Sequence, residues 1–454
     1  MFNMNRSVFW KRGLPVLLAG LMAFWISSCS EPGPAEPQAE PPAGGIGKEL
    51  NTDPSNAEGK NENSEDSSAD GKEPDLKPIS EEDSIGGRAE EADPHQPQDG
   101  FQGVPIGTDP AQSGQSETES GTRPGENSSP PLIAYHGPVE HIFFHPLIVY
   151  PELAFDGDAM AKGYDDWFVT IKEFNAILES LYRNQYMLIS LESLFERGEE
   201  DGKRYIKRKQ LMMPEGKKPL VLSIDDLNYY EYMRENGNAH KLVLDEEGNV
   251  SVYTVDPNGN ASVSASIEIV PIVDEFVRKH PDFSLNGAKG VIALTGYEGV
   301  LGYRTNERES PDYEREKEAA EAVVKKLKQT GWTFASHGWG HLDARKVSLE
   351  RLVQDTKRWK EEVEPIIGYT PVYIYPYGSR PDTGSDKFHS LLEAGFDILC
   401  SVGPTPYLKL SDGAAMMDRR HIDGMALRTQ GERLSVLFDA SVVLDPVRPP
   451  ATGG

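Results

Sequence analysis

The chain has 454 residues, enough for two or three domains of average size, and a formal net charge of −27 at pH 7. Much of that negative charge lies in residues 31–130, which contain 23 acidic residues and 6 basic ones. Such an acidic chain is a poor partner for nucleic acid, and its two cysteines exclude a disulfide framework.

The first 29 residues have the organisation of an export signal. Arg6, Lys11 and Arg12 precede an apolar run over residues 14–26, and two serines then stand directly before Cys29. This ending resembles the lipobox of bacterial lipoproteins, in which the cysteine is lipidated and becomes the first residue of the mature protein. A transmembrane anchor is the alternative, but the run is at the short end for a bilayer span. We therefore expect an extracytoplasmic protein, attached to the bacterial cell membrane by a lipid on Cys29.

The composition then changes twice. Residues 30–131 are rich in Pro, Gly, Ser, Glu and Asp and nearly free of aromatic residues, so they predict a disordered acidic linker. Residues 132–445 have the composition of a folded domain, and residues 446–454 are expected to form a flexible tail. The remaining cysteine, Cys400, stands in an apolar run that predicts a buried strand thiol.

Strand-like and helix-like patterns alternate along the domain. Thr170 and Glu173 form a capping box that predicts a helix start, and a second helix is expected from Ser190. Strands are predicted at 142–148, 187–189, 219–224, 291–295, 333–336, 372–375 and 396–401. Repeated βα units of this length predict a parallel sheet, either open or closed.

Residues 228–265 interrupt this alternation. Turn signals between alternating residues predict a β-rich insertion at the end of the strand 219–224. The insertion begins with Tyr229, Tyr230 and Tyr232, which could stack on sugar rings. Packing of the insertion against the rest of the domain is the commoner role for such tyrosines.

Two adjacent carboxylates, Asp225 and Asp226, end the apolar strand that precedes the insertion. That strand has the pattern of one buried on both faces, as in parallel sheets. In a β/α barrel the active site is built at the carboxyl ends of the strands. Two neighbouring acids there stay ionised together only if a cation or a hydrogen-bond network compensates. The remaining question is whether the chain supplies such a cation site.

Two histidines, His337 and His341, follow the strand 333–336 and can supply such a site. Their spacing places both on the same side of a helical turn, and Gly338 and Gly340 predict a loop or helix start. The spacing alone is common by chance. Together with Asp226, however, it gives a His/His/Asp set that leaves open positions on a divalent ion, an arrangement used to activate water.

Three motifs, taken in order, resemble those of the NodB-like polysaccharide deacetylases, the family-four carbohydrate esterases. Ser-Ile-Asp-Asp at 223–226 resembles their Thr-Phe-Asp-Asp motif. Ser-His-Gly-Trp-Gly-His at 336–341 contains their His-Ser/Thr-x-x-His motif, with glycine in place of the hydroxyl residue. Tyr-Pro-Tyr-Gly at 375–378 resembles their Arg-x-Pro-Tyr-Gly motif. The resemblance covers about residues 132–440.

The resemblance implies a deformed (β/α) barrel with a divalent metal, commonly zinc, that hydrolyses the N-acetyl group of an amino sugar. Asp226, His337 and His341 would hold the metal, and Asp225 would act as the general base. The backbone N–H of Tyr377 would help to stabilise the oxyanion, and Pro376, Gly378 and Trp339 would bind the substrate.

The sequence also departs from the family pattern. Leu227 replaces the usual glycine after the acid pair, and Ile374 stands where an arginine often pairs with the base. The usual Asp-Trp and Leu-x-His motifs are not evident, and His421 is the nearest candidate for the general acid, with a partly exposed histidine as the alternative. His145 ends the first strand and either faces the cleft or packs structurally.

These observations predict a lipid-anchored enzyme that deacetylates N-acetylated cell-wall or extracellular polysaccharide, such as peptidoglycan, poly-N-acetylglucosamine or a chitin-like polymer. Two alternatives remain open. One is a glycan-binding lipoprotein that has lost efficient catalysis, and the other is an esterase that removes O-acetyl groups, since the same activation of water serves both bonds.

Overall fold

The computed structural model of the protein describes residues 130–450. The expected export signal with Cys29, nearly all of the expected linker and residues 451–454 lie outside the described residues. Among the helices of the described part, none is long and apolar enough to cross a membrane.

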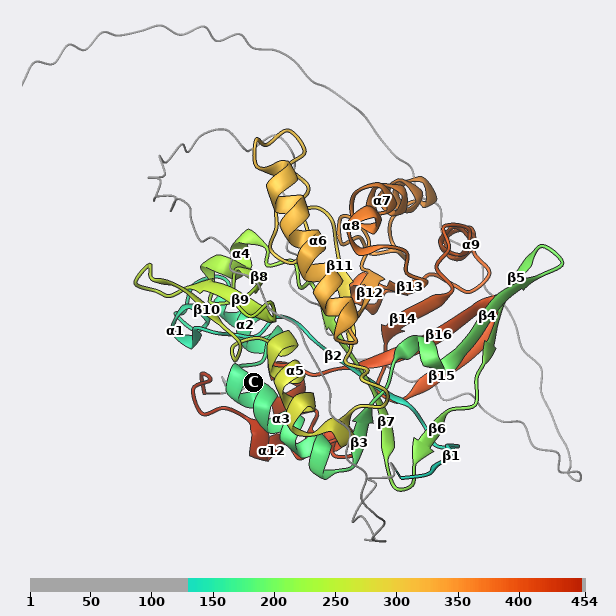
Figure 1. Ribbon diagram of the computed structural model, residues 1–454, viewed down its shortest axis with the longest axis horizontal. Helices are drawn as coiled ribbons and strands as arrows, with labels where there is room; N and C mark the ends of the chain where they lie inside the picture. The colour runs from blue at the N-terminus through green and yellow to red at the C-terminus, as the bar shows by residue number, and fades with distance from the viewer. Residues whose placement is uncertain (1–129, 451–454) are drawn as a thin grey trace, which may run out of the picture. The chain divides into compact units, whose positions relative to one another are not determined.

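Seven parallel strands within residues 130–450 close into a barrel (Figure 1). Around the ring they follow the order β7, β11, β12, β13, β14, β16 and β2, and β2 pairs again with β7. Their bounds are β2 Glu140–Phe144, β7 Lys218–Asp225, β11 Val291–Leu294, β12 Thr333–Ser336, β13 Val372–Ile374, β14 Ile398–Val402 and β16 Ala414–His421. The predicted (β/α) barrel is confirmed, and its sheet is closed.

The other strands lie outside the ring. β3 (Tyr186–Leu188) pairs in parallel with β7, and β15 (Tyr407–Ser411) pairs antiparallel with β16. The predicted insertion is confirmed as a three-stranded antiparallel sheet. A hairpin of β4 and β5, which Figure 1 shows projecting from the barrel, was not predicted. The bounds are β1 Leu132–Ala134, β4 Phe195–Glu200, β5 Lys203–Arg208, β6 Met212–Pro214, β8 Lys241–Leu244, β9 Val250–Val255 and β10 Ala261–Ser264.

The helices follow the βα alternation. The capping box predicted for α3 is present, because Thr170 Oγ1 accepts from the Glu173 amide and Glu173 Oε2 accepts from the Thr170 amide. The helix predicted from Ser190 is a single 3₁₀ turn, Leu191–Leu194, that leads directly into β4. The α-helices are α1 Pro151–Ala154, α2 Ala161–Trp167, α3 Ile171–Arg183, α4 Glu231–Glu235, α5 Ile269–Lys279, α6 Tyr313–Gln329, α7 Leu349–Glu362, α8 Glu364–Ile367, α9 Asp386–Glu393, α10 Gly424–Thr429, α11 Gly431–Leu434 and α12 Ala440–Val443.

In six of the seven barrel strands, all but β2, alternate residues belong to two different hydrophobic clusters. In β7, Leu220 and Leu222 pack in the cluster that contains the apolar face of α3. Val221 belongs instead to the cluster inside the barrel, with Ile374 and Cys400. Because side chains alternate along a strand, the positions two and four residues after Val221 also face the barrel interior, and they carry polar groups. The prediction that Cys400 is a buried thiol is confirmed.

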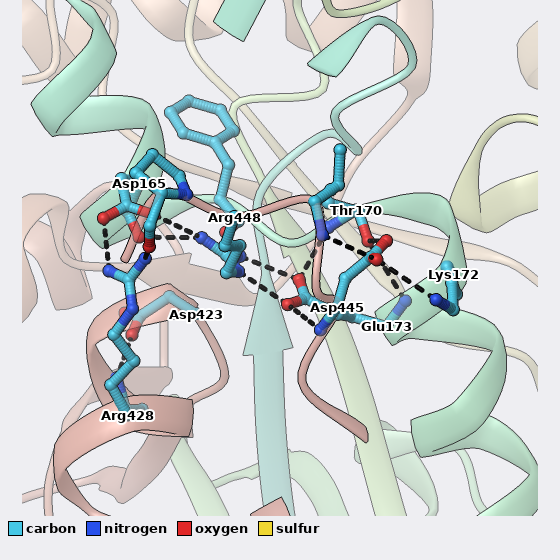
Figure 2. A network of polar contacts seen from close by, with 12 residues as sticks. Asp165, Thr170, Lys172, Glu173, Asp423, Arg428, Asp445 and Arg448 are labelled. Atoms are coloured by element: carbon cyan, nitrogen blue, oxygen red, sulfur yellow. Dashed lines mark hydrogen bonds and ion pairs between the residues drawn. The ribbon is translucent and has the colours of Figure 1, made fainter. Parts of the chain in front are cut away.

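The C-terminal segment is tied to α2 and α3 by a buried network that we call the C-terminal clasp, made of Asp165, Glu173, Asp445 and Arg448 (Figure 2). Arg448 donates through Nε to Glu173 at 2.5 Å and through Nη1 to Asp165 at 3.1 Å. Its Nη2 donates to the carbonyl oxygen of Phe168 at 2.5 Å. Arg448 was expected in a flexible tail, but it is only 6% exposed, so the ordered chain extends beyond residue 445.

Candidate active site

The two adjacent carboxylates lie where β7 ends. Asp225 is the last residue of the strand, and Asp226 follows with a backbone φ of 58°. His341 and Tyr377, two other predicted site residues, have φ values of 51° and 58°. Left-handed backbone is uncommon for residues other than glycine and tends to occur at functional sites. The loops after three different barrel strands thus share this conformation.

Asp226, His337 and His341 converge as predicted. Their ligand atoms all lie within 4.8 Å of one another. Oδ2 of Asp226 is 3.6 Å from Nε2 of His341 and 4.0 Å from Nε2 of His337. Asp226 and His337 are 5% and 2% exposed.

The chemistry of this donor set fits a divalent ion. Nδ1 of His337 lies 2.8 Å from the carbonyl oxygen of Ile374, which can only accept, so Nδ1 carries the proton. The other nitrogen, Nε2, then presents a lone pair toward Asp226. A backbone carbonyl that orients an imidazole in this way is the usual support for a histidine ligand.

Asp225 is held by an arginine that the sequence analysis did not identify. Arg419 of β16 donates from Nη1 to Oδ1 of Asp225 at 2.7 Å and from Nη2 to Oδ2 at 2.9 Å. Burial alone would raise the pKa of Asp225, but the charge of Arg419 and its hydrogen bonds lower it to about 2. Asp225 is therefore ionised at neutral pH despite being 3% exposed.

The position of this arginine explains a departure from the family pattern. Ile374 of β13 stands where the family often has an arginine, and its side chain packs inside the barrel. β16 supplies the guanidinium from across the barrel instead. Alternation along β16 is the signal that could have found it, because Met417 and Arg419 are two residues apart and face the same interior.

The loop that carries the two histidines is fixed by a second residue that sequence reasoning missed. Asp355 of α7 accepts from the amides of Trp339 and Gly340, each at 2.7 Å. Gly338 adopts a φ of 68°, and a Cβ there would lie 2.9 Å from the Asp355 carboxylate. This position therefore requires glycine, which accounts for the missing hydroxyl residue in the motif.

Trp339 packs against α7. Its Nε1 donates to Glu362 at 2.7 Å, and the guanidinium of Arg358 lies 3.4 Å from the centre of the ring. These contacts account for the position of the indole. They give no support to the substrate-binding role predicted for it.

The third motif forms a 3₁₀ turn, Pro376–Gly378, after β13. The ring of Tyr377 packs edge-on against His341, with centroids 4.6 Å apart, and is 39% exposed. Gly378 has a φ of 63°, and a Cβ there would come within 2.7 Å of Val402, so the turn fits only glycine at this position. The motif thus places Tyr377 directly beside the predicted metal ligands.

A cavity opens beside these residues. Polar groups on its wall come from Asp226, His145 and His341. Most of the remaining wall is aromatic. Tyr230 and Tyr232 of the insertion, for which stacking on sugars was one of the two expected roles, and the predicted site residue Tyr377 lie in it. The other aromatic residues of the wall were not predicted: Tyr164, Trp167 and Phe168 from α2 and the segment after it, and Tyr297 after β11. The C-terminal clasp holds α2, which carries part of this wall.

Two histidines, His145 and His421, are candidates for the proton donor. His145 lines the cavity; its Nδ1 donates to the carbonyl oxygen of Trp167 at 3.2 Å, and its Nε2 lies 4.0 Å from Oδ2 of Asp226. His421, at the end of β16, is not among the residues that line the cavity. Its Nδ1 donates to Asp423 at 2.7 Å, and its Nε2 lies 2.9 Å from Nη1 of Arg433.

Comparison with known proteins agrees with this geometry. Residues 305–392 match a family model described as polysaccharide deacetylase. No curated protein matches the chain. The matched segment contains His337, His341 and the third motif.

The structure is also similar to solved deacetylases, each with a TM-score of 0.37. One is the Streptococcus pyogenes deacetylase PplD in complex with acetate (13% identity, 64% of this chain and 98% of that one). A polysaccharide deacetylase from Bacillus cereus has 15% identity over 66% of this chain and 69% of its own. A de-N-acetylase from Aggregatibacter actinomycetemcomitans has 15% identity over 63% and 96%. The family match over residues 305–392 and the three motifs in place on the barrel thus agree with the resemblance of this chain to the polysaccharide deacetylases.

Proposed function

We propose that the protein hydrolyses N-acetyl groups on an amino-sugar polysaccharide and that it requires a divalent metal, zinc, to do so. The observation that carries the proposal is the convergence of Asp226, His337 and His341 within 4.8 Å. One carboxylate oxygen and two imidazole nitrogens suit Zn²⁺ and leave positions open for water and substrate. When bound, the ion supplies Lewis acidity, which makes water a better nucleophile near neutral pH and polarises the acyl carbonyl.

Asp225 is the proposed acceptor of the proton from the attacking water. Arg419 keeps the Asp225 carboxylate ionised and fixes its orientation through two hydrogen bonds. An ionised carboxylate has about four lone-pair sites, so two of them remain for water. The low pKa of Asp225 makes it a weak base. Its proposed role therefore rests on its position, next in the chain to the proposed metal ligand Asp226.

Tyr377 is proposed to stabilise the oxyanion through its backbone N–H. The turn at 376–378 fixes the backbone, since proline sets the φ of its first residue and Gly378 accepts a conformation that other residues avoid. A donor held in place before the reaction need not reorganise when charge develops on the substrate oxygen.

The departing amine needs a proton. His421 was the nearest candidate for this task in the sequence, with a partly exposed histidine as the alternative, and its role stays a prediction. The cavity favours His145, because its imidazole lines the wall beside Asp226 while its Nδ1 is oriented by a backbone carbonyl. The aromatic wall suits the flat apolar faces of sugar rings.

The proposal is tested by acetate release from N-acetylglucosamine oligomers and peptidoglycan. Asp226→Ala and His341→Ala are expected to lose both zinc uptake and acetate release while keeping the circular dichroism spectrum of the parent protein. His389→Ala, which removes an exposed histidine of α9, is the matched control and should keep both. Unchanged acetate release by the Asp226 or His341 variant would refute the proposed site.

The two alternatives are separated by the same assays. A glycan-binding protein without catalysis would bind the oligomers and release no acetate; Arg419 removes one reason for that alternative, because the arginine thought to be missing is present. An O-acetyl esterase would release acetate faster from an O-acetylated sugar than from its N-acetylated counterpart.

We also propose that a lipid on Cys29 attaches the protein to the outer face of the cell membrane. A disordered linker of about a hundred residues, as the sequence predicts, would typically span on the order of 50–60 Å, enough for the domain to reach outward into a cell wall.

A further inference from the structure

The two carboxylate oxygens of Asp226 have different surroundings. Oδ2 faces the imidazoles of His337 and His341, at 4.0 and 3.6 Å. Oδ1 points the other way and accepts a hydrogen bond from the hydroxyl of Tyr230 at 2.6 Å. Tyr230 comes from the insertion and belongs to none of the three motifs.

The direction of this hydrogen bond is set by its neighbours. The Tyr230 hydroxyl has a single proton, and an ionised Asp226 can only accept. Oγ1 of Thr295 lies 2.5 Å from the same hydroxyl oxygen, so Thr295 donates to Tyr230 and Tyr230 donates to Asp226. A one-way chain therefore runs from the end of β11 to the carboxylate.

Tyr230 is held firmly enough to orient a ligand. Its ring stacks on Tyr297, with centroids 4.7 Å apart and planes 16° apart, and on Tyr232 at 5.8 Å and 26°. Tyr230 is 2% exposed and Thr295 is fully buried. Because packing already immobilises the Tyr230 ring, its hydrogen bond to Asp226 costs little additional conformational entropy.

We infer that Tyr230 is a positioning residue for the metal, one that occupies Oδ1 of Asp226 and leaves only Oδ2 to bind the ion. This inference rests on the proposed metal site. The hydrogen bond fixes the carboxylate toward the two imidazoles before an ion arrives, and it disfavours binding through both oxygens, because it already uses one lone pair of Oδ1 and sets the direction of the carboxylate. The coordination position saved in this way stays open for water or the acyl oxygen.

Tyr230→Phe removes the hydroxyl and keeps the stacked ring. The zinc dissociation constant of the mature protein, measured by competition with a chromogenic chelator, is expected to rise about 10- to 100-fold, as when other groups that orient metal ligands are removed. Tyr164→Phe is the matched control, because Tyr164 is also buried in the cavity wall but donates to Asn238 at 2.6 Å. Its zinc dissociation constant should stay within about twofold of the parent value.

A second readout reports on the carboxylate directly. With Co²⁺ in the site, binding through both oxygens of Asp226 raises the coordination number, so the visible absorption of the Tyr230→Phe complex should weaken. Thr295→Val, which removes the donor to Tyr230, should shift both readouts in the same direction and serves as the test if Tyr230→Phe does not fold.

The outcomes distinguish this inference from the proposed function. If the parent protein takes up no zinc or cobalt, the metal site itself is refuted. If the parent binds zinc and both Tyr230→Phe and Thr295→Val bind it equally well, with unchanged cobalt spectra, the metal site stands and the role of Tyr230 is refuted. Equal weakening by Tyr164→Phe would also overturn the inference, because loss of any buried hydroxyl would then suffice.

Discussion

At the scale of single residues, the site depends on charged side chains that come from distant parts of the chain. Asp225 and Arg419 are 194 positions apart and make two hydrogen bonds inside the barrel. The sequence predicted the acid and the metal ligands, because strand ends and short spacing are local signals. It could not assign Asp355 to the site, and alternation along β16 could place Arg419 only on the interior face, because the partners of both residues are set by which strands and helices become neighbours in the closed barrel.

Arg419→Met tests this pairing. Removing one partner of a buried ion pair leaves the other charge uncompensated, so the free energy of unfolding should fall by about 3–5 kcal/mol, measured by urea denaturation. The kcat for acetate release should fall about 100-fold, the lower end of what a positioned proton acceptor contributes. Zinc content should not change, because Arg419 bonds to Asp225 and not to the three proposed ligands.

Arg419→Lys keeps the charge and loses the paired geometry, so it should fall between the parent and the Met variant. Parent-like kcat in the Met variant would show that Asp225 needs no orientation by Arg419.

His145→Gln and His421→Gln separate the two candidate proton donors. Because His145 lines the cavity and His421 does not, the first substitution should lower kcat more strongly than the second, with circular dichroism confirming that both variants fold. A larger loss of kcat in His421→Gln than in His145→Gln would assign the proton donor to His421, the candidate named from the sequence.

At the scale of elements, the aromatic wall depends on how α2 is held. Apolar runs and capping signals predicted six of the seven barrel strands, all but β16, and the start of α3. They did not predict α2, or that the C-terminal segment would fold back onto it, because the clasp is built from side chains far apart in sequence. Asp445 accepts from Thr170 at 3.0 Å and from Lys172 at 3.2 Å, and Arg448 bonds to Asp165 and Glu173.

We expect the C-terminal clasp to contribute to the free energy of unfolding by an amount that depends on pH. Burial raises the pKa of Asp445, but hydrogen bonds from the Val447 amide, Thr170 and Lys172 outweigh it and hold the pKa below the ordinary 3.8. An acid whose pKa is lower in the folded state stabilises the protein above its unfolded pKa and loses that effect as pH falls. The stability difference between the parent and Asp445→Asn should therefore be full above about pH 4 and shrink below it.

Urea denaturation at several pH values measures this difference. Lys172→Met is the control, because Lys172 is largely exposed and such surface pairs contribute at most about 1 kcal/mol. A difference that stays constant from pH 6 to pH 2 would contradict the assigned role of Asp445.

At the scale of the whole molecule, a parallel barrel brings the ends of its strands to one place. Motifs after β7, β12 and β13 therefore meet although they are far apart in sequence. The alternation of predicted strands and helices was enough to indicate a parallel sheet, and the family resemblance indicated the barrel. Closure of the ring between β2, β7 and β16 could not be read from the sequence, because it depends on strand pairing and not on local pattern.

The expected lipid anchor belongs to the same scale. Cys29→Ser should release the protein from the membrane fraction of the producing cells and abolish incorporation of a labelled fatty acid, because the lipid is expected on that cysteine thiol. Deacetylation by the purified variant should be unchanged. A Cys29→Ser protein that still fractionates with membranes and carries label would exclude this mode of attachment.

The central claim is that Asp226, His337 and His341 hold one divalent ion on which deacetylation depends. The most direct measurement is a titration of chelator-stripped mature protein with Zn²⁺, with acetate release from an N-acetylglucosamine oligomer recorded at each step. The account predicts negligible release at the start, a linear rise and a plateau at one equivalent of zinc. Acetate release that is as fast before zinc is added as after it would contradict the account.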